Sequence, residues 1–319
     1  YFLLGAFASG FLLLGITFIY GAIGSFNILQ ISASSIVSTG LSQKLLAVGF
    51  VLILFAFAFK MSAVPFHFWA PDVYSGAPTV ITAYMSTIVK IGAVAGFFRL
   101  FVVAVSSYSK FDFYSGYTGI LLLIAILTIT VGNVIAASQS NVKRLLAYSS
   151  IGHAGFIILG VAMLSPSTNY VVWYYLLAYS LSSLASFWVL LVVSQNDNSE
   201  DISIFNGLVK RNPVLAGTMT IALLSMAGIP PLAGFFAKYF VLLNVLEKGY
   251  ILIAVIAILS SLIGVYYYFR IIIAMFTGIE ETKTGIKISG FDKLVLMLIS
   301  VILLFVGLAP DFIFGLIFR

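Results

Sequence analysis

The sequence contains no cysteine, only two histidines and few charged residues. Without thiolates the chain forms no disulfide, attaches no haem through cysteine and holds no iron–sulfur cluster on cysteine ligands. Two histidines also leave little for a histidine-built redox centre. Charged residues make up 8% of the 319 residues and hydrophobic residues 62%, whereas a soluble domain carries about 25% charge. These values exclude an ordinary soluble domain and indicate an integral membrane protein.

Long apolar runs recur along the whole chain. A helix needs about 20 residues to span the hydrocarbon core of a bilayer. The chain shows neither the α/β alternation of a soluble enzyme nor the alternating strands of an outer-membrane barrel. We therefore predict an all-α polytopic membrane protein in which residues 1–319 form a single transmembrane domain of about nine helices. The predicted spans are 1–23, 44–70, 78–104, 117–138, 145–164, 170–194, 213–246, 250–276 and 292–317.

The formal net charge is +6, and no nucleic-acid-binding motif accompanies it. The excess of basic residues therefore favours basic loops on one side of a membrane rather than nucleic acid as a partner. The loop side richer in basic residues should be cytoplasmic, or its organellar equivalent. That side carries Lys143, Arg144, Lys210, Arg211, Lys283, Lys287 and Lys293, whereas the opposite side carries Lys44, Lys110, Lys248 and Arg319.

Two of the predicted spans are too long for one straight helix, and both contain proline near their middle. Pro65 and Pro71 interrupt the second span, and Gly228, Pro230 and Pro231 interrupt the seventh. Proline removes a backbone donor and clashes with the preceding turn. At membrane depth such breaks are tolerated where they are buried in protein or line a wet cavity. Paired interrupted segments point to a transport site, although a simple proline kink is the alternative at each.

Three lysines lie within the predicted spans: Lys60 before the first break, Lys90 near the middle of the third span and Lys238 after the second break. A charge at the centre of a spanning helix costs about 2.5–3.5 kcal/mol on insertion scales. Snorkelling to the interface is the alternative for Lys60 and Lys238, but Lys90 is far from both helix ends. Lysine can exchange its proton, whereas arginine cannot. We therefore predict that the three lysines are buried and lie on a proton path, at similar depth near the bilayer midplane together with His153.

His153 is the fourth candidate for this path. It follows Tyr148, Ser149 and Ser150, whose hydroxyls could hold a file of water between the lysines. An imidazole titrates near neutral pH, although a packed, hydrogen-bonded histidine is an equal alternative. We interpret the other polar residues as structural: His67 and Asp72 as backbone caps at the first break, Arg99 and Arg270 as anchors or subunit contacts, and Tyr266, Tyr267 and Tyr268 as an interfacial aromatic belt.

Four stretches of the sequence resemble a known family. They are KMSAVPFHFWAPDVYSGAPTVITAYMSTIVK, QSNVKRLLAYSSIGHAGF, LLSMAGIPPLAGFFAKYF and GVYYYFR, which together span residues 60 to 270. They resemble the antiporter-like membrane subunits of respiratory complex I, and the motif PFHFWAPDVYSGAP is most similar to the NuoN type. The wider family includes the Mrp-type sodium/proton antiporter subunits, which usually read PLHxWLPDAY at this place.

This resemblance implies an antiporter-like fold of fourteen helices with broken transmembrane helices and two inverted five-helix repeats. The chain would hold helices six to fourteen, with the N-terminal helices missing. It also begins at Tyr1 inside an apolar run, so we expect it to be the later part of a longer protein. By motif match, Lys60 and Lys238 are the lysines of the two broken helices, and Lys90 is the connecting lysine. The glutamate that partners the first lysine in the family would lie upstream of Tyr1.

The resemblance also implies a function, that of a proton-translocating membrane subunit of NADH:quinone oxidoreductase. The proton path would use Lys60, Lys90, Lys238 and His153. No cofactor is expected in this chain, whereas flavin, iron–sulfur clusters and quinone are expected in partner subunits, with other membrane subunits on both flanks. The expected location is the bacterial inner membrane, with the mitochondrial inner membrane or the thylakoid membrane as alternatives. An Mrp-type sodium/proton antiporter subunit and a non-pumping structural membrane subunit remain as alternative functions.

Overall fold

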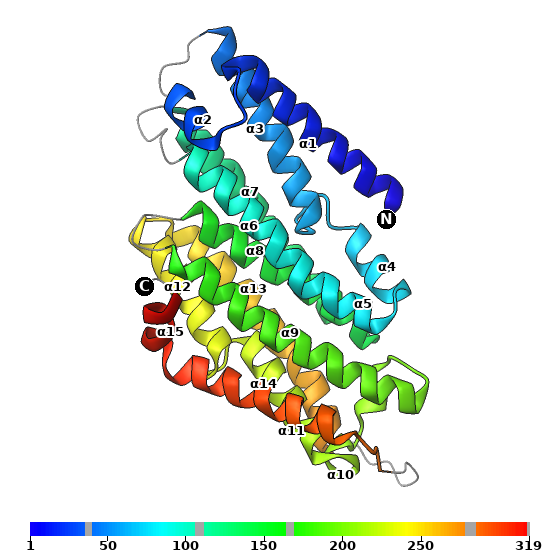
Figure 1. Cartoon of the computed structure of the whole chain (residues 1–319). Helices are drawn as coiled ribbons and strands as arrows, with labels where there is room; N and C mark the ends of the chain where they lie inside the picture. The colour runs from blue at the N-terminus through cyan, green and yellow to red at the C-terminus, as the bar shows by residue number, and fades with distance from the viewer. Residues whose placement is uncertain (36–39, 106–111, 164–168, 278–284, 318–319) are drawn as a thin grey trace.

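The computed structural model describes residues 1–35, 40–105, 112–163, 169–277 and 285–317. Within these residues the regular secondary structure is helical, and eight helices are long and apolar enough to cross a membrane. The elements are α1 (Phe2–Ile23), α2 (Ile28–Ser35), α3 (Leu41–Lys60), α4 (Trp69–Gly76), α5 (Thr79–Tyr84), the π-helical turn η1 (Met85–Val89), α6 (Lys90–Val105), α7 (Asp112–Ala137), α8 (Val142–Ala162), α9 (Tyr170–Asp197), the 3-10 turn η3 (Ile202–Phe205), α10 (Leu208–Arg211), α11 (Pro213–Ala227), α12 (Ala233–Glu247), α13 (Ile251–Thr277), α14 (Gly290–Leu308) and α15 (Pro310–Ile317) (Figure 1).

The prediction of an all-α, multi-pass membrane protein is confirmed, and both predicted helix breaks are present. In the first, α3 ends at Lys60 and α4 begins at Trp69; in the second, α11 ends at Ala227 and α12 begins at Ala233. Each break contains a cis X–Pro peptide bond. A third break was not predicted: the last span divides at Ala309, and Pro310 opens α15. Proline is well tolerated at a first helical position because the backbone donor that it lacks has no intrahelical partner there.

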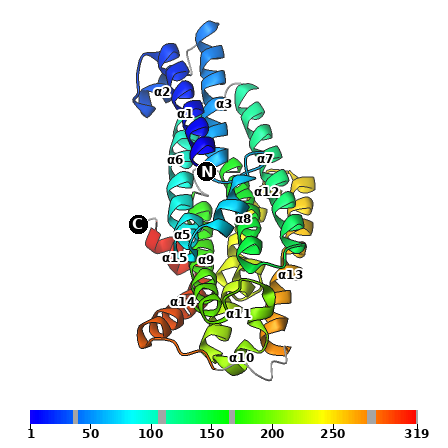
Figure 2. The same ribbon diagram turned by 90° about the vertical axis from the view of Figure 1, so that its right-hand side faces the viewer.

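Helix α8 forms the centre of the molecule. In its most apolar stretch 94% of the residues are buried, against 17% for α1. Helices α7, α9, α12 and α4 pack against α8, whereas α1 packs mainly against α3. Figures 1 and 2 show α1 to α3 at one end of an elongated bundle and α10, α11 and α14 at the other. Polar groups on α8 therefore lie in the protein interior, where they need partners from the surrounding helices.

The loops on the predicted basic side contact one another. Asn141 and Asp201 form an isolated antiparallel bridge, and Asn212 Nδ2 donates to the carbonyl of Ile286 over 3.0 Å. These contacts join the loops that precede α8, α11 and α14, as the alternation of the spans requires. Among the basic residues used for the predicted orientation, Lys110, Lys283 and Arg319 lie outside the described residues.

The second break depends on Gly234 at the start of α12. A Cβ at this position would lie 1.8 Å from the carbonyl oxygen of Ser225 and 2.6 Å from its carbon. We expect Gly234→Ala to prevent the two halves of the break from packing and to reduce the yield of folded, membrane-inserted protein to a small fraction. Monodisperse protein recovered after detergent extraction measures this. Gly217→Ala on α11 is the control, because no atom lies within 4 Å of its Cβ and alanine favours the helix. Equal yields from both variants would contradict the prediction.

Candidate functional site

Lys90 is buried in the interior, with 2% of its surface exposed. It follows η1 directly, and such π-helical turns are frequent at functional sites. Its Nζ donates to the carbonyl of Ser150 over 2.7 Å and also contacts Ser150 Oγ. The hydroxyl of Tyr179 donates to the same Oγ over 2.8 Å, and the Tyr179 ring lies 5.3 Å from the ammonium nitrogen. Neutral oxygens and a ring thus surround this lysine, and no described carboxylate pairs with it.

His153 lies on α8, one turn after Ser150, and its side chain connects α8 to two other helices. Its Nδ1 is 2.8 Å from the hydroxyl of Tyr175 on α9, and its Nε2 is 3.2 Å from the hydroxyl of Tyr268 on α13. The Tyr268 hydroxyl also contacts Ser149 Oγ. The imidazole and Tyr179 ring centroids are 4.9 Å apart. Since both ring nitrogens face hydroxyls, which donate and accept, either tautomer finds partners.

The predicted aromatic belt on α13 is wrong for two of its three tyrosines. Tyr266 is 60% exposed, but Tyr267 and Tyr268 are each 1% exposed. Successive helical residues point about 100° apart, so a helix with one lipid-facing side turns some of three adjacent residues inward. The Tyr267 hydroxyl donates to Asn133 Oδ1 over 3.0 Å, and Arg270 donates to the carbonyl of Ala137 over 2.9 Å. The arginine therefore caps the end of α7 within the chain.

Lys238 lies on α12, just after the second break, and is 9% exposed. Its Nζ donates to the carbonyl of Ala227 over 3.0 Å and to Ser261 Oγ over 2.8 Å. Ala227 ends α11, where carbonyls lack helical partners and the negative end of the helix dipole lies. Gly228 follows with φ of 84°, and a Cβ there would lie 3.0 Å from Lys238 Cδ. The break thus provides both the acceptor and the space for this ammonium.

The structure brings Lys90, His153 and Lys238 into one polar cluster. His153 and Lys238 line a common small pocket with Asn133, Tyr267 and Tyr268. His153 also lines a second small cavity of about 10 Å³ with Tyr179, Ser182 and Ser225. That is enough for roughly one water molecule. Hydroxyls and an imidazole therefore fill the space between the two lysines.

Lys60 does not join this cluster, and the prediction that it is buried is wrong for the described chain. Its side chain is exposed at the end of α3, and it has no hydrogen-bond or ion-pair partner among the described residues. Other groups satisfy the backbone at this break: Val64 N donates to Thr128 Oγ1, and Trp69 Nε1 donates to the carbonyl of Phe59, each over 3.0 Å. No described helix covers Lys60, which is why the expected burial does not arise within this chain.

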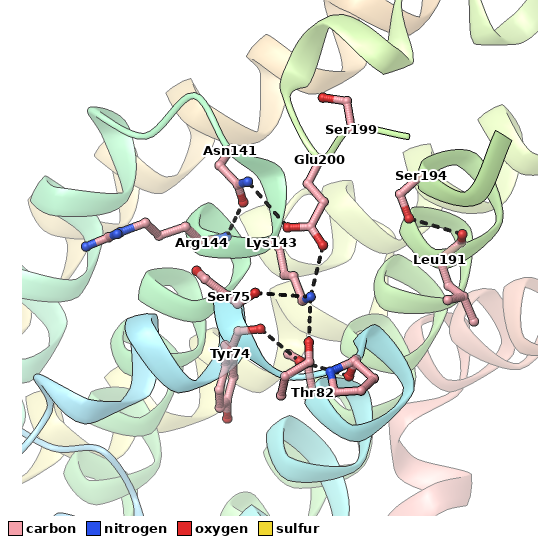
Figure 3. A network of polar contacts seen from close by, with 12 residues as sticks. Tyr74, Ser75, Thr82, Asn141, Lys143, Arg144, Leu191, Ser194, Ser199 and Glu200 are labelled. Atoms are coloured by element: carbon pink, nitrogen blue, oxygen red, sulfur yellow. Dashed lines mark hydrogen bonds and ion pairs between the residues drawn. The ribbon is translucent and has the colours of Figure 1, made fainter. Parts of the chain in front are cut away.

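Lys143 is a further buried lysine, and its burial was not predicted because it lies in a predicted basic loop. Lys143 is 3% exposed, and its Nζ donates to the carbonyl of Ala77 over 2.7 Å and to Glu200 Oε1 over 2.9 Å. Figure 3 shows the Lys143 and Glu200 side chains pointing toward each other, with the carbonyl of Ser75 beside them at 3.4 Å. Lys143 therefore ties the start of α8 both to the end of α4 and to the segment that follows α9. An available signal was the acid-containing stretch around Glu200 in a chain with only 10 acidic residues.

Comparison with known proteins agrees with this fold. The family model described as "NADH:quinone oxidoreductase/Mrp antiporter, TM" matches residues 1–264. NADH-quinone oxidoreductase subunit N of Cytophaga hutchinsonii is 43% identical over 311 residues, which is 98% of this chain and 66% of that protein. In respiratory complex I from Thermus thermophilus with bound aureothin, one chain aligns with a TM-score of 0.81 at 33% identity, covering 98% of this chain and 66% of that one.

A chain of the Mrp complex from Dietzia sp. DQ12-45-1b has a TM-score of 0.84 at 24% identity, covering 97% of this chain and 64% of that chain, so this likeness shows the fold alone. The chain spans about two thirds of the length of the relatives that it matches. The match to the family model covers most of the chain, including both broken helices and the buried Lys90 and Lys238. The chain therefore belongs to the NADH:quinone oxidoreductase/Mrp antiporter transmembrane family.

Proposed function

We propose that this chain is a proton-translocating membrane subunit of an NADH:quinone oxidoreductase, of the subunit N type. The observation that carries the proposal is the buried polar cluster around α8. It holds two buried lysines, Lys90 and Lys238, on neutral oxygens, with His153 between them. Buried ionisable side chains in a membrane protein mark ion and proton pathways. A sequence identity of 43% to a subunit N protein supports the same function.

The proposed path uses groups that both donate and accept protons. From Lys90 it passes Ser150 and Tyr179, then His153 with its tyrosine partners, and ends at Lys238. The cavity beside His153 and Tyr179 has room for about one water molecule. Such a water would bridge the hydroxyls to the imidazole. Because lysine exchanges its proton and arginine does not, the two lysines are the loading sites and the intervening groups connect them.

Lys60 would join the proposed path by pairing with a residue outside the described helices. A lysine within a spanning segment costs about 2.5–3.5 kcal/mol unless it meets protein or water, and Lys60 is exposed. We propose that a carboxylate on a further membrane segment pairs with it, as the family resemblance implies. The large exposed apolar side chains of α1, α13 and α14 lie on both sides of the bundle. They fit contacts with lipid and with other membrane subunits on both flanks.

The redox chemistry would take place in other subunits. Within the residues that the structure describes, no group of three or more histidine, aspartate or glutamate side chains is placed to hold a metal ion. As the family resemblance implies, flavin, iron–sulfur clusters and quinone would be held by partner subunits. Quinone reduction there would supply the energy for moving each charge, about 2.3 kcal/mol per 100 mV. The bacterial inner membrane is the proposed location, because the relative from Cytophaga hutchinsonii is bacterial.

The test is to isolate the full-length protein from its own host with everything that co-purifies in mild detergent. We expect flavin, iron–sulfur clusters and NADH oxidation in the preparation, and NADH-driven proton uptake in reconstituted vesicles. Tyr268→Phe, which removes the hydroxyl beside His153, should lower the protons moved per NADH without lowering assembly. Tyr266→Phe is the matched control, because Tyr266 is exposed.

Three results would contradict the proposal. Absence of flavin and NADH oxidation, together with sodium-dependent proton exchange, would identify an Mrp-type antiporter subunit instead. An intact complex whose proton uptake is unchanged in Lys90→Met and in Lys238→Met would identify a non-pumping structural subunit. Equal proton uptake in Tyr268→Phe and Tyr266→Phe would remove Tyr268 from the path.

A further inference from the structure

Two adjacent serines on α9, Ser182 and Ser183, each contact one of the two segments that carry the buried lysines. Helix α9 packs against η1 and α5 on the Lys90 side and against α11 and α12 on the Lys238 side. Both serine side chains are buried. A hydroxyl buried in this way needs a hydrogen-bond partner, and each serine has one on another helix.

Ser183 contacts the segment that carries Lys90. Its Oγ lies 3.0 Å from the Oγ of Ser86 in η1. Ser86 already donates its proton to the carbonyl of Ala83 over 2.9 Å, so it accepts from Ser183. Ser86 precedes Lys90 by four residues, which places the two on one face of the helix. The contact therefore fixes the rotation of the segment that directs Lys90 toward Ser150.

Ser182 makes the equivalent contact on the other side. Its Oγ lies 2.9 Å from Ser225 Oγ, in the last turn of α11, and 2.8 Å from the carbonyl of Ala178 in its own helix. Since that carbonyl can only accept, the Ser182 proton is directed to it and Ser182 accepts from Ser225. Ser225 Oγ in turn accepts from the backbone N–H of Gly234 over 3.2 Å, in the first turn of α12. Gly234 precedes Lys238 by four residues, as Ser86 precedes Lys90. The hydroxyl of Ser225 thus holds together the two halves of the second break, one turn before its lysine.

We propose that the Ser182–Ser183 pair couples the two lysine-bearing segments, so that the positions of Lys90 and Lys238 change together. Ser182 and Ser183 are neighbours on one continuous helix, so a shift of η1 against Ser183 moves Ser182 as well. That movement acts on Ser225, on the break, and so on the carbonyl of Ala227 that holds Lys238. The two serines are positioning residues, and the inference rests on the proposed function, since it concerns how the two lysines act in sequence.

The test is a double-mutant cycle measured as the rate of NADH-driven proton uptake, in vesicles with matched amounts of the complete complex. Ser182→Ala and Ser183→Ala should each lower this rate by about three- to tenfold, the range expected from one buried hydrogen bond. The double variant should be no worse than either single variant, because both contacts belong to one connection. Ser186→Ala is the matched control: it is buried on the same helix, and its hydroxyl donates to the carbonyl of Ser182 in its own helix. That control should match wild type.

Losses that multiply in the double variant would overturn the proposal, as would single variants that match Ser186→Ala.

If the alanine variants assemble poorly, a reversible disulfide between η1 and α9 gives a second test, since the chain has no cysteine of its own. We expect a Ser86→Cys, Ser183→Cys variant to pump when oxidised to the disulfide and to lose at least half of that activity on reduction, with wild type treated in parallel. Higher activity after reduction, or equal activity in both states, would contradict coupling. Lys238→Met in the same vesicles reports separately on the proposed function, because wild-type pumping in that variant would refute the path itself.

Discussion

Replacing Lys238 by methionine is expected to remove most NADH-driven proton uptake while leaving assembly of the complex nearly unchanged. Methionine keeps much of the volume and the apolar stem, which packs over Gly228 and lies near the Phe156 ring. It cannot carry a proton, and loss of a positioned proton-transfer group costs about a hundredfold or more in such steps. We therefore expect uptake in vesicles to fall by at least about tenfold at equal complex content.

Lys238→Arg is the companion variant, since arginine keeps the charge but does not release its proton. It should fail as well, which separates proton exchange from positive charge alone. Lys210→Met is the control, because it removes the same charge from an exposed position on α10. Wild-type pumping in both Lys238 variants would make Lys238 a structural lysine only.

The second large effect is expected from Lys143→Met, and it concerns stability rather than transport. This change leaves Glu200 and the carbonyl of Ala77 without their buried cation. Breaking a fully buried ion pair by removing one partner costs about 3–5 kcal/mol. Because the Glu200 side chain is 27% exposed, we expect roughly 2–3 kcal/mol here. The variant should lower the melting temperature in detergent and the fraction of assembled complex.

The adjacent residue provides the control for this prediction. Arg144 forms an ion pair with Asp72 at 3.4 Å, but both side chains are exposed. Such surface pairs contribute about 0–1 kcal/mol, so Arg144→Met should melt close to wild type. Glu200→Gln should fall between the two, since its amide oxygen still accepts from Lys143. If Lys143→Met and Arg144→Met melt at the same temperature, the buried contacts of Lys143 do not stabilise the attachment of α8 to the end of α4 and to Glu200.

The parts of the site that could be predicted from sequence depend on local chemistry. Proline in a helix interior kinks or breaks the helix, and this located the breaks at Pro65 and at Pro230 and Pro231. Pro310 divides the last span for the same reason, and that break was not predicted. Lys90 lies too far from either end of its span to reach the interface, and it is buried as predicted. Lys238 follows a break, where a helix end supplies free carbonyls, and the carbonyl of Ala227 does accept a hydrogen bond from its ammonium group.

The failures concern which side of a helix faces which neighbour. Lys60 and Lys90 have the same chemistry and similar apolar surroundings in sequence, yet Lys60 is exposed and Lys90 buried. The difference arises because α8 covers Lys90, whereas no described helix covers Lys60. Tyr266 and Tyr268 differ in the same way, since only Tyr268 faces α8 and finds His153 there. A loop lysine such as Lys143 becomes buried because Ser75, Ala77 and Glu200 come together from distant parts of the chain.

By itself, the sequence determined the membrane environment, the helical class, the two breaks and the presence of lysines within spans. Each of these follows from the composition of a single segment, because hydrocarbon requires every backbone group to be satisfied within a helix and makes each charge costly. Only the tertiary structure decided which polar groups meet: His153 with Tyr268, Ser150 with Lys90, and the two α9 serines with both lysine-bearing segments. Those partners are 43 to 115 residues apart in the chain, so their contacts depend on how the helices pack and on no local pattern.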